Sequence, residues 1–68
     1  MIDNTVIGKN IANYRKIKGL TQGELAKDVG VSKGYIAAIE KGGRRPLIKT
    51  LIRIAECLGV ELRVLLED

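Results

Sequence analysis

Histidine is absent from this sequence of 68 residues, and cysteine occurs once, at Cys57. Such a chain cannot form the common Cys/His metal clusters, and it has no Ser-His or Cys-His nucleophile pair. It also lacks a phosphate-cradling loop and a pair of carboxylates placed for catalysis. We therefore expect no enzyme, metal or cofactor. Cys57 is interpreted as a small, partly buried helix residue, with a redox-sensitive thiol at a dimer interface as the alternative.

Long apolar runs are missing as well. The apolar residues recur in short helical stripes, and no run is long enough to cross a membrane. The N-terminus lacks the charged, apolar and small-residue order of a signal peptide. These features predict a cytoplasmic protein. A chain of this length is expected to form one domain, residues 1–68, whose modest core dimerisation often supports.

Residues 21–41 have the pattern of two short helices joined by a tight turn. Thr21 stands three residues before Glu24, which is the spacing of a capping box. Gly30 can adopt the left-handed conformation that ends a helix, and Ser32 can cap the next helix. This is the helix-turn-helix pattern, in which the second helix can enter the major groove of DNA.

Apolar spacing and caps predict an all-α fold with five helices. The expected helices span about residues 5–18, 21–28, 32–41, 48–58 and 61–67. The core stripe expected for the fourth helix comprises Ile48, Leu51, Ile54, Ala55 and Leu58. Ile52 falls off this stripe and is expected to be exposed. Leu47 precedes the helix and cannot cap it, so either the cap is lost or Leu47 is buried elsewhere, for example between two subunits.

The net charge of +4 is unevenly distributed along the chain. Residues 32–53 hold six lysines and arginines against one acid, whereas residues 54–68 hold four acids against one arginine. The second helix of the motif and the segment after it are therefore basic, and the C-terminus is acidic. This polarity is typical of a domain that turns one face to phosphates; an ordinary solvated surface is the alternative.

From Ile7 to Leu66 the sequence resembles the lambda-repressor-like (Cro/repressor, or XRE) family of DNA-binding domains. The resemblance is carried by Arg15, Gly19-Leu20-Thr21-Gln22, Glu24-Leu25-Ala26, Gly30-Val31-Ser32, Tyr35-Ile36, Ile39-Glu40-Lys41-Gly42, Arg44, Pro46, Leu51, Ile54-Ala55 and Leu58-Gly59-Val60. It implies a five-helix fold and a bacterial or phage transcriptional regulator, most often a dimeric repressor on a pseudo-palindromic operator. It does not identify the operator or the regulated genes.

The resemblance also implies roles for single residues. Arg15 matches the arginine that pairs with the glutamate at the end of the recognition helix, here Glu40; a free phosphate contact is the alternative. Gln22 matches a glutamine that donates its amide to a DNA phosphate and often touches the start of that helix; a solvated glutamine is the alternative. Residues 41–45 match a second phosphate clamp, and a solvated basic loop is the alternative. Its two glycines are expected to bring backbone N–H groups near a phosphate.

The helix from residue 32 to 41 carries few hydrogen-bonding side chains toward the expected groove. Lys33 can donate to guanine O6 and N7, whereas Ala37 and Ala38 can only pack on thymine methyl groups or allow close approach. Gly34 indicates that the backbone comes close to DNA or to a neighbouring side chain. Specificity is therefore expected to depend on Lys33, on one or two arginines after the helix, and on DNA shape.

The site predictions are as follows. The predicted base contacts are Lys33, Gly34, Ala37, Ala38 and Arg45. The predicted phosphate contacts are Gln22, Ser32, Tyr35, Lys41 and Arg44, with the Tyr35 hydroxyl on the phosphate. The last helix has more apolar residues than a monomer core covers, so the predicted homodimer interface is Leu47, Leu62, Val64 and Leu66.

Three settings fit these predictions: a phage or mobile-element repressor, a restriction-modification controller, or an antitoxin with a partner protein. All three allow the protein to regulate its own gene. The alternative function is a protein-interaction or architectural module with little DNA sequence specificity. The bare side chains at Gly34, Ala37 and Ala38 favour that alternative.

Overall fold

The computed structural model describes residues 3–68, so the first two residues of the expected domain lie outside the description. Five helices occur in this part of the chain, and no strand does. They are α1 Asn4–Ile17, α2 Gln22–Val29, α3 Lys33–Glu40, α4 Ile48–Leu58 and α5 Leu62–Leu66. The predicted all-α fold is confirmed, and every predicted helix end lies within one residue of the observed end.

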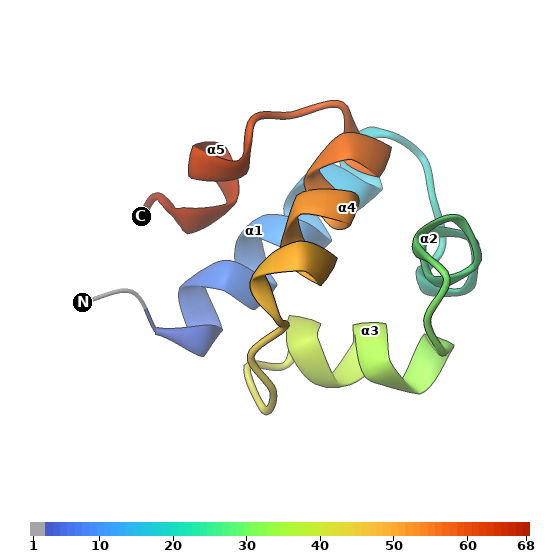
Figure 1. Cartoon of the computed structure of the whole chain (residues 1–68), viewed down its shortest axis with the longest axis horizontal. Helices are drawn as coiled ribbons and strands as arrows, with labels where there is room; N and C mark the ends of the chain where they lie inside the picture. Colours follow the sequence, from blue (N-terminus) through green and yellow to red (C-terminus); the bar gives the residue numbers. More distant parts are fainter. Residues whose placement is uncertain (1–2) are drawn as a thin grey trace.

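The helices are arranged around α1 and α4, which overlap in the middle of the molecule (Figure 1). α3 runs along the lower edge of this view, α2 stands at the right, and α5 lies near the two termini. α1 contacts α3, α4 and α5, and α2 contacts α3 and α4. This arrangement leaves the outer side of α3 uncovered.

Local capping sets the ends of α2 and α3. The Thr21 hydroxyl accepts the Glu24 N–H at 3.0 Å, and the Glu24 carboxylate accepts the Thr21 N–H at 2.8 Å. Gly30 ends α2 with a φ of 88°, a left-handed conformation that glycine adopts without a Cβ clash. The Ser32 hydroxyl then accepts the Tyr35 N–H at 3.1 Å. The predicted capping box, glycine stop and serine cap are all confirmed.

The hydrophobic core takes one stripe from each helix. Its buried residues are Ile7, Ile11, Leu25, Ala26, Val29, Ile36, Ile39, Leu51, Ile54, Ala55, Leu58 and Leu65. The stripe predicted for α4 is confirmed at Leu51, Ile54, Ala55 and Leu58, and Ile52 is 42% exposed as predicted. The prediction that Ile48 belongs to the core is wrong, because this side chain is 64% exposed. As the first residue of α4, Ile48 lines an open hollow of about 310 Å³ instead of packing against a neighbouring helix.

More of the apolar surface of α5 is buried against the rest of the protein than the sequence suggests. Leu65 is fully buried, and Leu62 and Leu66 are partly buried and pack against the core. The Asn10 side-chain amide of α1 donates to the carbonyls of Leu65 at 3.0 Å and Glu67 at 2.6 Å. This amide satisfies acceptors at the end of α5 and ties that helix to α1. The apolar surplus that predicted a dimer through α5 is therefore smaller than expected.

Gly8 allows α1 to meet the end of α3 backbone to backbone. A Cβ at position 8 would overlap the carbonyl oxygen of Ile39 and would lie 2.9 Å from that of Glu40. Gly8 is buried, so no solvent-filled gap could absorb the added methyl group. Sequence reasoning did not identify this glycine, because its partners stand far away along the chain.

Gly8→Ala is expected to destabilise the fold by about 1–3 kcal/mol through overpacking. Gly34→Ala is the matched control in another helix, where a Cβ would meet nothing within 4 Å. That control is expected to be neutral or to stabilise the fold by up to about 1 kcal/mol, because alanine favours helix more than glycine does. Urea unfolding followed by circular dichroism measures both effects. Equal effects of the two substitutions would contradict the close contact at Gly8.

Candidate nucleic-acid interface

One side of α3 holds the helix to the core and the other faces outward. Ile36 and Ile39 are each 0% exposed. On the outer side Lys33 and Gly34 are exposed, and Ala37, one turn after Lys33, is half-buried. A short helix with an uncovered outer side can enter a DNA major groove. The structure therefore brings three of the predicted base contacts together on one surface.

Gly34 has open space around it. A Cβ built at this position meets nothing within 4 Å. The interpretation that Gly34 makes room for a neighbouring side chain of the same protein is therefore wrong. The remaining interpretation, that the bare backbone makes room for DNA, stays a prediction.

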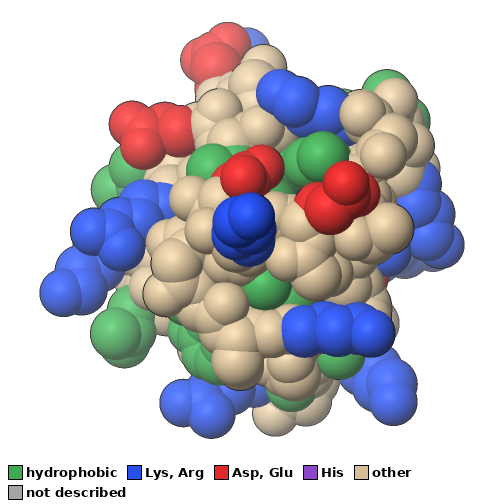
Figure 2. Space-filling model, turned by 90° about the vertical axis from the view of Figure 1, so that its right-hand side faces the viewer, with side chains coloured by type: hydrophobic (Ala, Val, Ile, Leu, Met, Phe, Trp, Pro, Cys, Tyr) green, Lys and Arg blue, Asp and Glu red, His purple; other side chains and the backbone are tan. Residues whose placement is uncertain are grey.

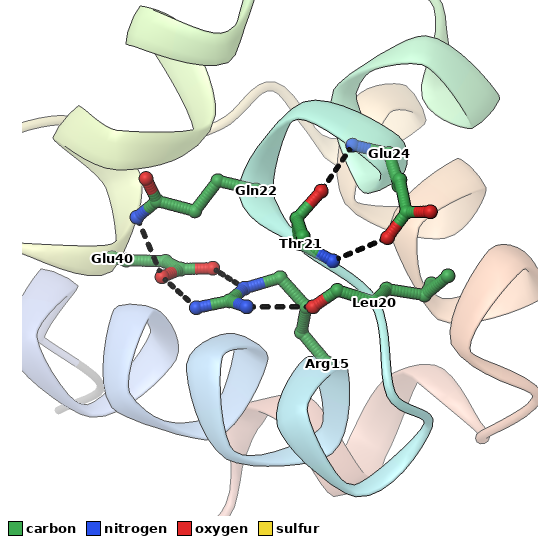
Figure 3. A network of polar contacts seen from close by, with 6 residues as sticks. All are labelled: Arg15, Leu20, Thr21, Gln22, Glu24 and Glu40. Atoms are coloured by element: carbon green, nitrogen blue, oxygen red, sulfur yellow. Dashed lines mark hydrogen bonds and ion pairs between the residues drawn. The ribbon is translucent and has the colours of Figure 1, made fainter.

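A buried ion pair fixes the C-terminal end of α3 (Figure 3). Arg15 donates from Nε to Glu40 Oε2 at 2.7 Å and from a terminal nitrogen to Glu40 Oε1 at 3.0 Å. Its other terminal nitrogen donates to the Leu20 carbonyl at 2.7 Å. The two side chains are only 10% and 7% exposed. Hydrogen bonding to Glu40 raises the pKa of Arg15 above its ordinary value, against the opposing effect of burial.

The geometry of this ion pair decides between the two roles considered for Arg15. A guanidinium that binds a phosphate needs donors turned to solvent. Nε and both terminal nitrogens of Arg15 instead donate within the protein, and the residue is 8% exposed. Arg15 is therefore a structural residue, and its alternative role as a free phosphate contact is wrong.

Gln22 joins the same network from α2. Its amide nitrogen donates to Glu40 Oε1 at 3.0 Å, so it contacts the end of α3 (Figure 3). The expected contact with the start of α3 is not the one made here. The amide nitrogen carries two hydrogens, and this bond uses one of them. The second hydrogen can still be donated to a phosphate.

The turn after α3 uses its backbone donors internally. The Gly42 N–H donates to the Ile39 carbonyl and the Gly43 N–H to the Ala38 carbonyl, each at 3.0 Å. Gly42 has a φ of 81°, so these two bonds form a Schellman cap on α3. The prediction that the two glycines bring N–H groups to a phosphate is therefore wrong. Their function is to end α3 and reverse the chain.

The basic residues of this turn have different surroundings. Lys41 is exposed at the end of α3. The Arg44 guanidinium lies over the Tyr35 ring, 4.9 Å from its centroid. Arg45 donates from Nε to the Asn4 side chain at 2.7 Å, which ties the turn to the start of α1. Arg45 thus stands apart from the other predicted base contacts, on the α1 side of the loop.

The start of α4 offers backbone donors that sequence reasoning did not assign to the site. Leu47 occupies the N-cap position and makes no side-chain cap hydrogen bond, so the predicted loss of the cap is observed. Leu47 is 65% exposed, and the alternative of a buried Leu47 does not hold within one subunit. An uncapped helix start carries free N–H groups and a partial positive charge. Such an end attracts phosphate.

Charge is graded across the surface that shows α2. In the view of Figure 2 the acidic side chains lie in the upper part, and the charged side chains along the lower edge are lysine and arginine. Because Figure 2 is turned about the vertical axis, α3 lies in its lower part, as it does in Figure 1. Exposed Ser32, Lys33, Lys41 and Arg44 belong to α3 and its flanking residues. The interface is therefore basic where a polyanion would approach α3.

Other kinds of site have little support in the described residues. No group of His, Cys, Asp and Glu side chains in residues 3–68 could hold a metal ion. Cys57 is half-buried, and burial raises the pKa of its thiol, together with the charges of Asp28 and Glu56. A raised pKa favours the protonated form of this thiol, which is the less reactive form. None of the described helices is long and apolar enough to cross a membrane.

A helix-turn-helix family model matches residues 11–65. The chain belongs to the Cro/repressor (XRE) helix-turn-helix family. Members of this family are DNA-binding transcriptional regulators, and they are not enzymes.

Sequence relatives include a phage protein and a bacterial regulator. The ImmF control region 10 kDa protein of Bacillus phage phi105 is 43% identical over 65 residues, covering 96% of this chain and 72% of that protein. SinR of Bacillus subtilis is 38% identical over 64 residues, covering 93% of this chain and 58% of SinR. The XRE relatives thus include proteins longer than the present chain.

Solved structures share the arrangement of helices. SinR, a master regulator for biofilm formation, has been solved in complex with DNA; it matches with a TM-score of 0.85 and 39% identity, covering 90% of this chain and 98% of that one. The restriction-modification controller protein C.AhdI from Aeromonas hydrophila matches with a TM-score of 0.87 and 29% identity, covering 91% and 94% of the two chains. The XRE fold implied by the sequence resemblance is confirmed by these structures.

Removing one member of the buried pair, as in Arg15→Met or Glu40→Leu, is expected to cost about 3–5 kcal/mol of folding free energy, because the remaining charge is left buried without a partner. The double variant Arg15→Met/Glu40→Leu is expected to recover most of this loss, since it leaves no unpaired charge. Thermal and urea unfolding of the three variants measures the differences. A double variant that loses the sum of the two single losses would show that the pair is not coupled.

Proposed function

We propose that this protein is a sequence-specific transcriptional repressor that places α3 in the major groove of its operator. The observation that carries the proposal is the uncovered side of α3, where Lys33 and Gly34 stand clear of the protein body. The exposed cations Lys41 and Arg44 follow directly after it. The similarity to SinR, which has been solved in complex with DNA, supports DNA binding by this chain.

In this proposal the residues divide into readers and anchors. Lys33 donates to guanine, while Gly34, Ala37 and Ala38 allow close approach or pack on thymine methyl groups. Arg45 is proposed as a further base contact, which requires it to leave Asn4 when DNA binds. The proposed phosphate anchors are the side chains of Gln22, Ser32, Lys41 and Arg44, and Tyr35 joins them through its contact with Arg44.

Repression would follow from occlusion of the promoter. A two-fold dimer places its two recognition helices about 34 Å apart, in successive major grooves of a pseudo-palindromic site. The relatives from a phage control region and a restriction-modification system support a regulator of one of these two kinds. A cytoplasmic repressor that controls its own gene fits both. An antitoxin role, with a partner protein, is the third setting.

The proposed dimer interface centres on the exposed apolar residues at the start of α4. Leu47, Ile48 and Ile52 are 65%, 64% and 42% exposed, and we call them the α4 patch. Of the interface residues predicted from the sequence, Leu47 belongs to this patch. Leu62, Val64 and Leu66 are partly buried, and Leu66 lines the hollow beside Ile48. These three residues would contribute at the edge of the interface rather than at its centre.

DNA binding is tested with a duplex from just upstream of the protein's own reading frame and with sites selected from a random pool. Lys33→Ala is expected to lose about 1–3 kcal/mol of discrimination at the base pair that Lys33 contacts. Lys9→Ala is the matched control. Lys9 is also an exposed lysine, but it belongs to α1 and lies beside Asn10 and the acidic Asp68 instead of on α3. The affinity of the wild-type protein is expected to fall as the salt concentration rises. A plot of log affinity against log salt should have a slope of about −0.9 for each phosphate neutralised. Fluorescence anisotropy at several salt concentrations measures both.

Two results would contradict the proposal in different ways. Equal affinity of the wild-type protein for all duplexes would favour the architectural or protein-interaction module. Selective binding that Lys33→Ala leaves intact would keep the repressor and remove α3 as its reader.

The dimer is tested by charge in the α4 patch. Ile48→Asp is expected to convert a dimer to a monomer, because a carboxylate loses its hydration when it is buried in an apolar interface. Ile17→Asp is the control, since Ile17 is an exposed isoleucine in a different helix, at 71% exposure. Sedimentation velocity gives the mass of each species. A dimer that survives Ile48→Asp, or a monomeric wild-type protein, would rule out this interface.

A further inference from the structure

Tyr35 and Arg44 form a cation–π pair at the edge of the proposed DNA interface. The Arg44 guanidinium carbon lies 4.9 Å from the centroid of the Tyr35 ring. Tyr35 is half-buried, whereas Arg44 is exposed. A cation within about 6 Å of an aromatic face is attracted by the ring quadrupole, and a planar guanidinium also stacks on it.

The backbone places both residues for this contact. Tyr35 lies in the first turn of α3, where the Ser32 hydroxyl accepts its N–H. After α3 ends, the chain turns back, because the Gly43 N–H donates to the Ala38 carbonyl. Ala38 follows Tyr35 by three residues and so lies on the same side of the helix. Arg44 is the next residue of the returning chain after Gly43, and its guanidinium reaches the Tyr35 ring.

We propose that Tyr35 is a positioning residue for Arg44: its ring holds the guanidinium at the place where Arg44 binds a DNA phosphate, and its hydroxyl is not needed. The inference rests on the proposed DNA binding. It replaces the prediction that the Tyr35 hydroxyl contacts the phosphate itself. The attraction of the ring needs none of the guanidinium N–H donors, so these donors stay available for the two parallel bonds that arginine makes to a phosphate. A guanidinium held in advance also loses less conformational freedom on binding.

The test uses four variants and a mixed-sequence DNA duplex of about three helical turns, since a phosphate contact does not depend on sequence. Tyr35→Phe keeps the ring and is expected to match the wild type in affinity and in salt dependence. Tyr35→Leu removes the ring and is expected to bind about two- to five-fold more weakly. Loss of the Arg44 phosphate contact in Arg44→Ala is expected to make the slope of log affinity against log salt shallower by at most about 0.9. Tyr35→Leu is expected to show part of this same change. Tyr35→Leu/Arg44→Ala is expected to bind no more weakly than Arg44→Ala alone.

Two controls separate positioning from loss of structure. Tyr14→Leu replaces the other tyrosine, which is also half-buried but lies in α1, and is expected to leave the salt slope unchanged. In the free protein, NMR should show the Arg44 δ protons shifted upfield by the ring in the wild type and in Tyr35→Phe, and unshifted in Tyr35→Leu. This second readout needs no DNA and no operator.

Each alternative result overturns the inference at a different step. Weakening by Tyr35→Phe equal to that by Tyr35→Leu assigns the contact to the hydroxyl. Additive losses in the double variant show that Tyr35 does not act through Arg44, and an unshifted Arg44 in the wild type shows that the contact does not persist in solution. A wild-type protein that binds no DNA overturns the proposed function and this role with it. Wild-type binding that Tyr35→Leu leaves unchanged overturns this role alone.

Discussion

The ion pair between Arg15 and Glu40 is the interaction on which the position of α3 depends. Glu40 is the last residue of α3, and it accepts hydrogen bonds from Arg15 of α1 and Gln22 of α2. A buried carboxylate tolerates little displacement, since each broken bond leaves a charge without compensation. The backbone contact at Gly8 acts on the same end of α3. The helix is therefore fixed at its C-terminal end, and its N-terminal half is left to meet a partner.

The features that could be predicted from the sequence are mostly those made by residues close together in the chain. The capping box at Thr21, the stop at Gly30 and the cap at Ser32 each involve residues at most four apart, and all three were predictable. The ion pair could be named only because the family resemblance supplied its partner, since its members stand 25 residues apart. The contact of Gly8 with Ile39 and the bond from Gln22 to Glu40 depend on how helices pack, and apolar periodicity carries no information about either.

The errors in the predicted site have the same origin. Gly42 and Gly43 are of a residue type that suits phosphate binding, but their N–H groups donate to carbonyls at the end of α3. Ile48 has the right spacing for the core, but at the first position of α4 no neighbouring helix covers it. In both cases the sequence identifies the kind of residue correctly, and only the three-dimensional surroundings decide what the residue contacts. Pattern reasoning is therefore stronger for the fold of this chain than for its surface.

The open space around Gly34 has a consequence for how such a regulator changes over time. Positions 33 and 34 are exposed, and a Cβ added at position 34 would meet nothing within 4 Å. In the proposed mode of DNA binding, small substitutions there alter which DNA is preferred without disturbing the core, the ion pair or the caps. Most mutations are limited by the small stability margin of a domain, but these two positions are largely exempt from that limit. A lineage carrying this chain can thus vary the outer side of α3 while the scaffold that presents this helix stays the same.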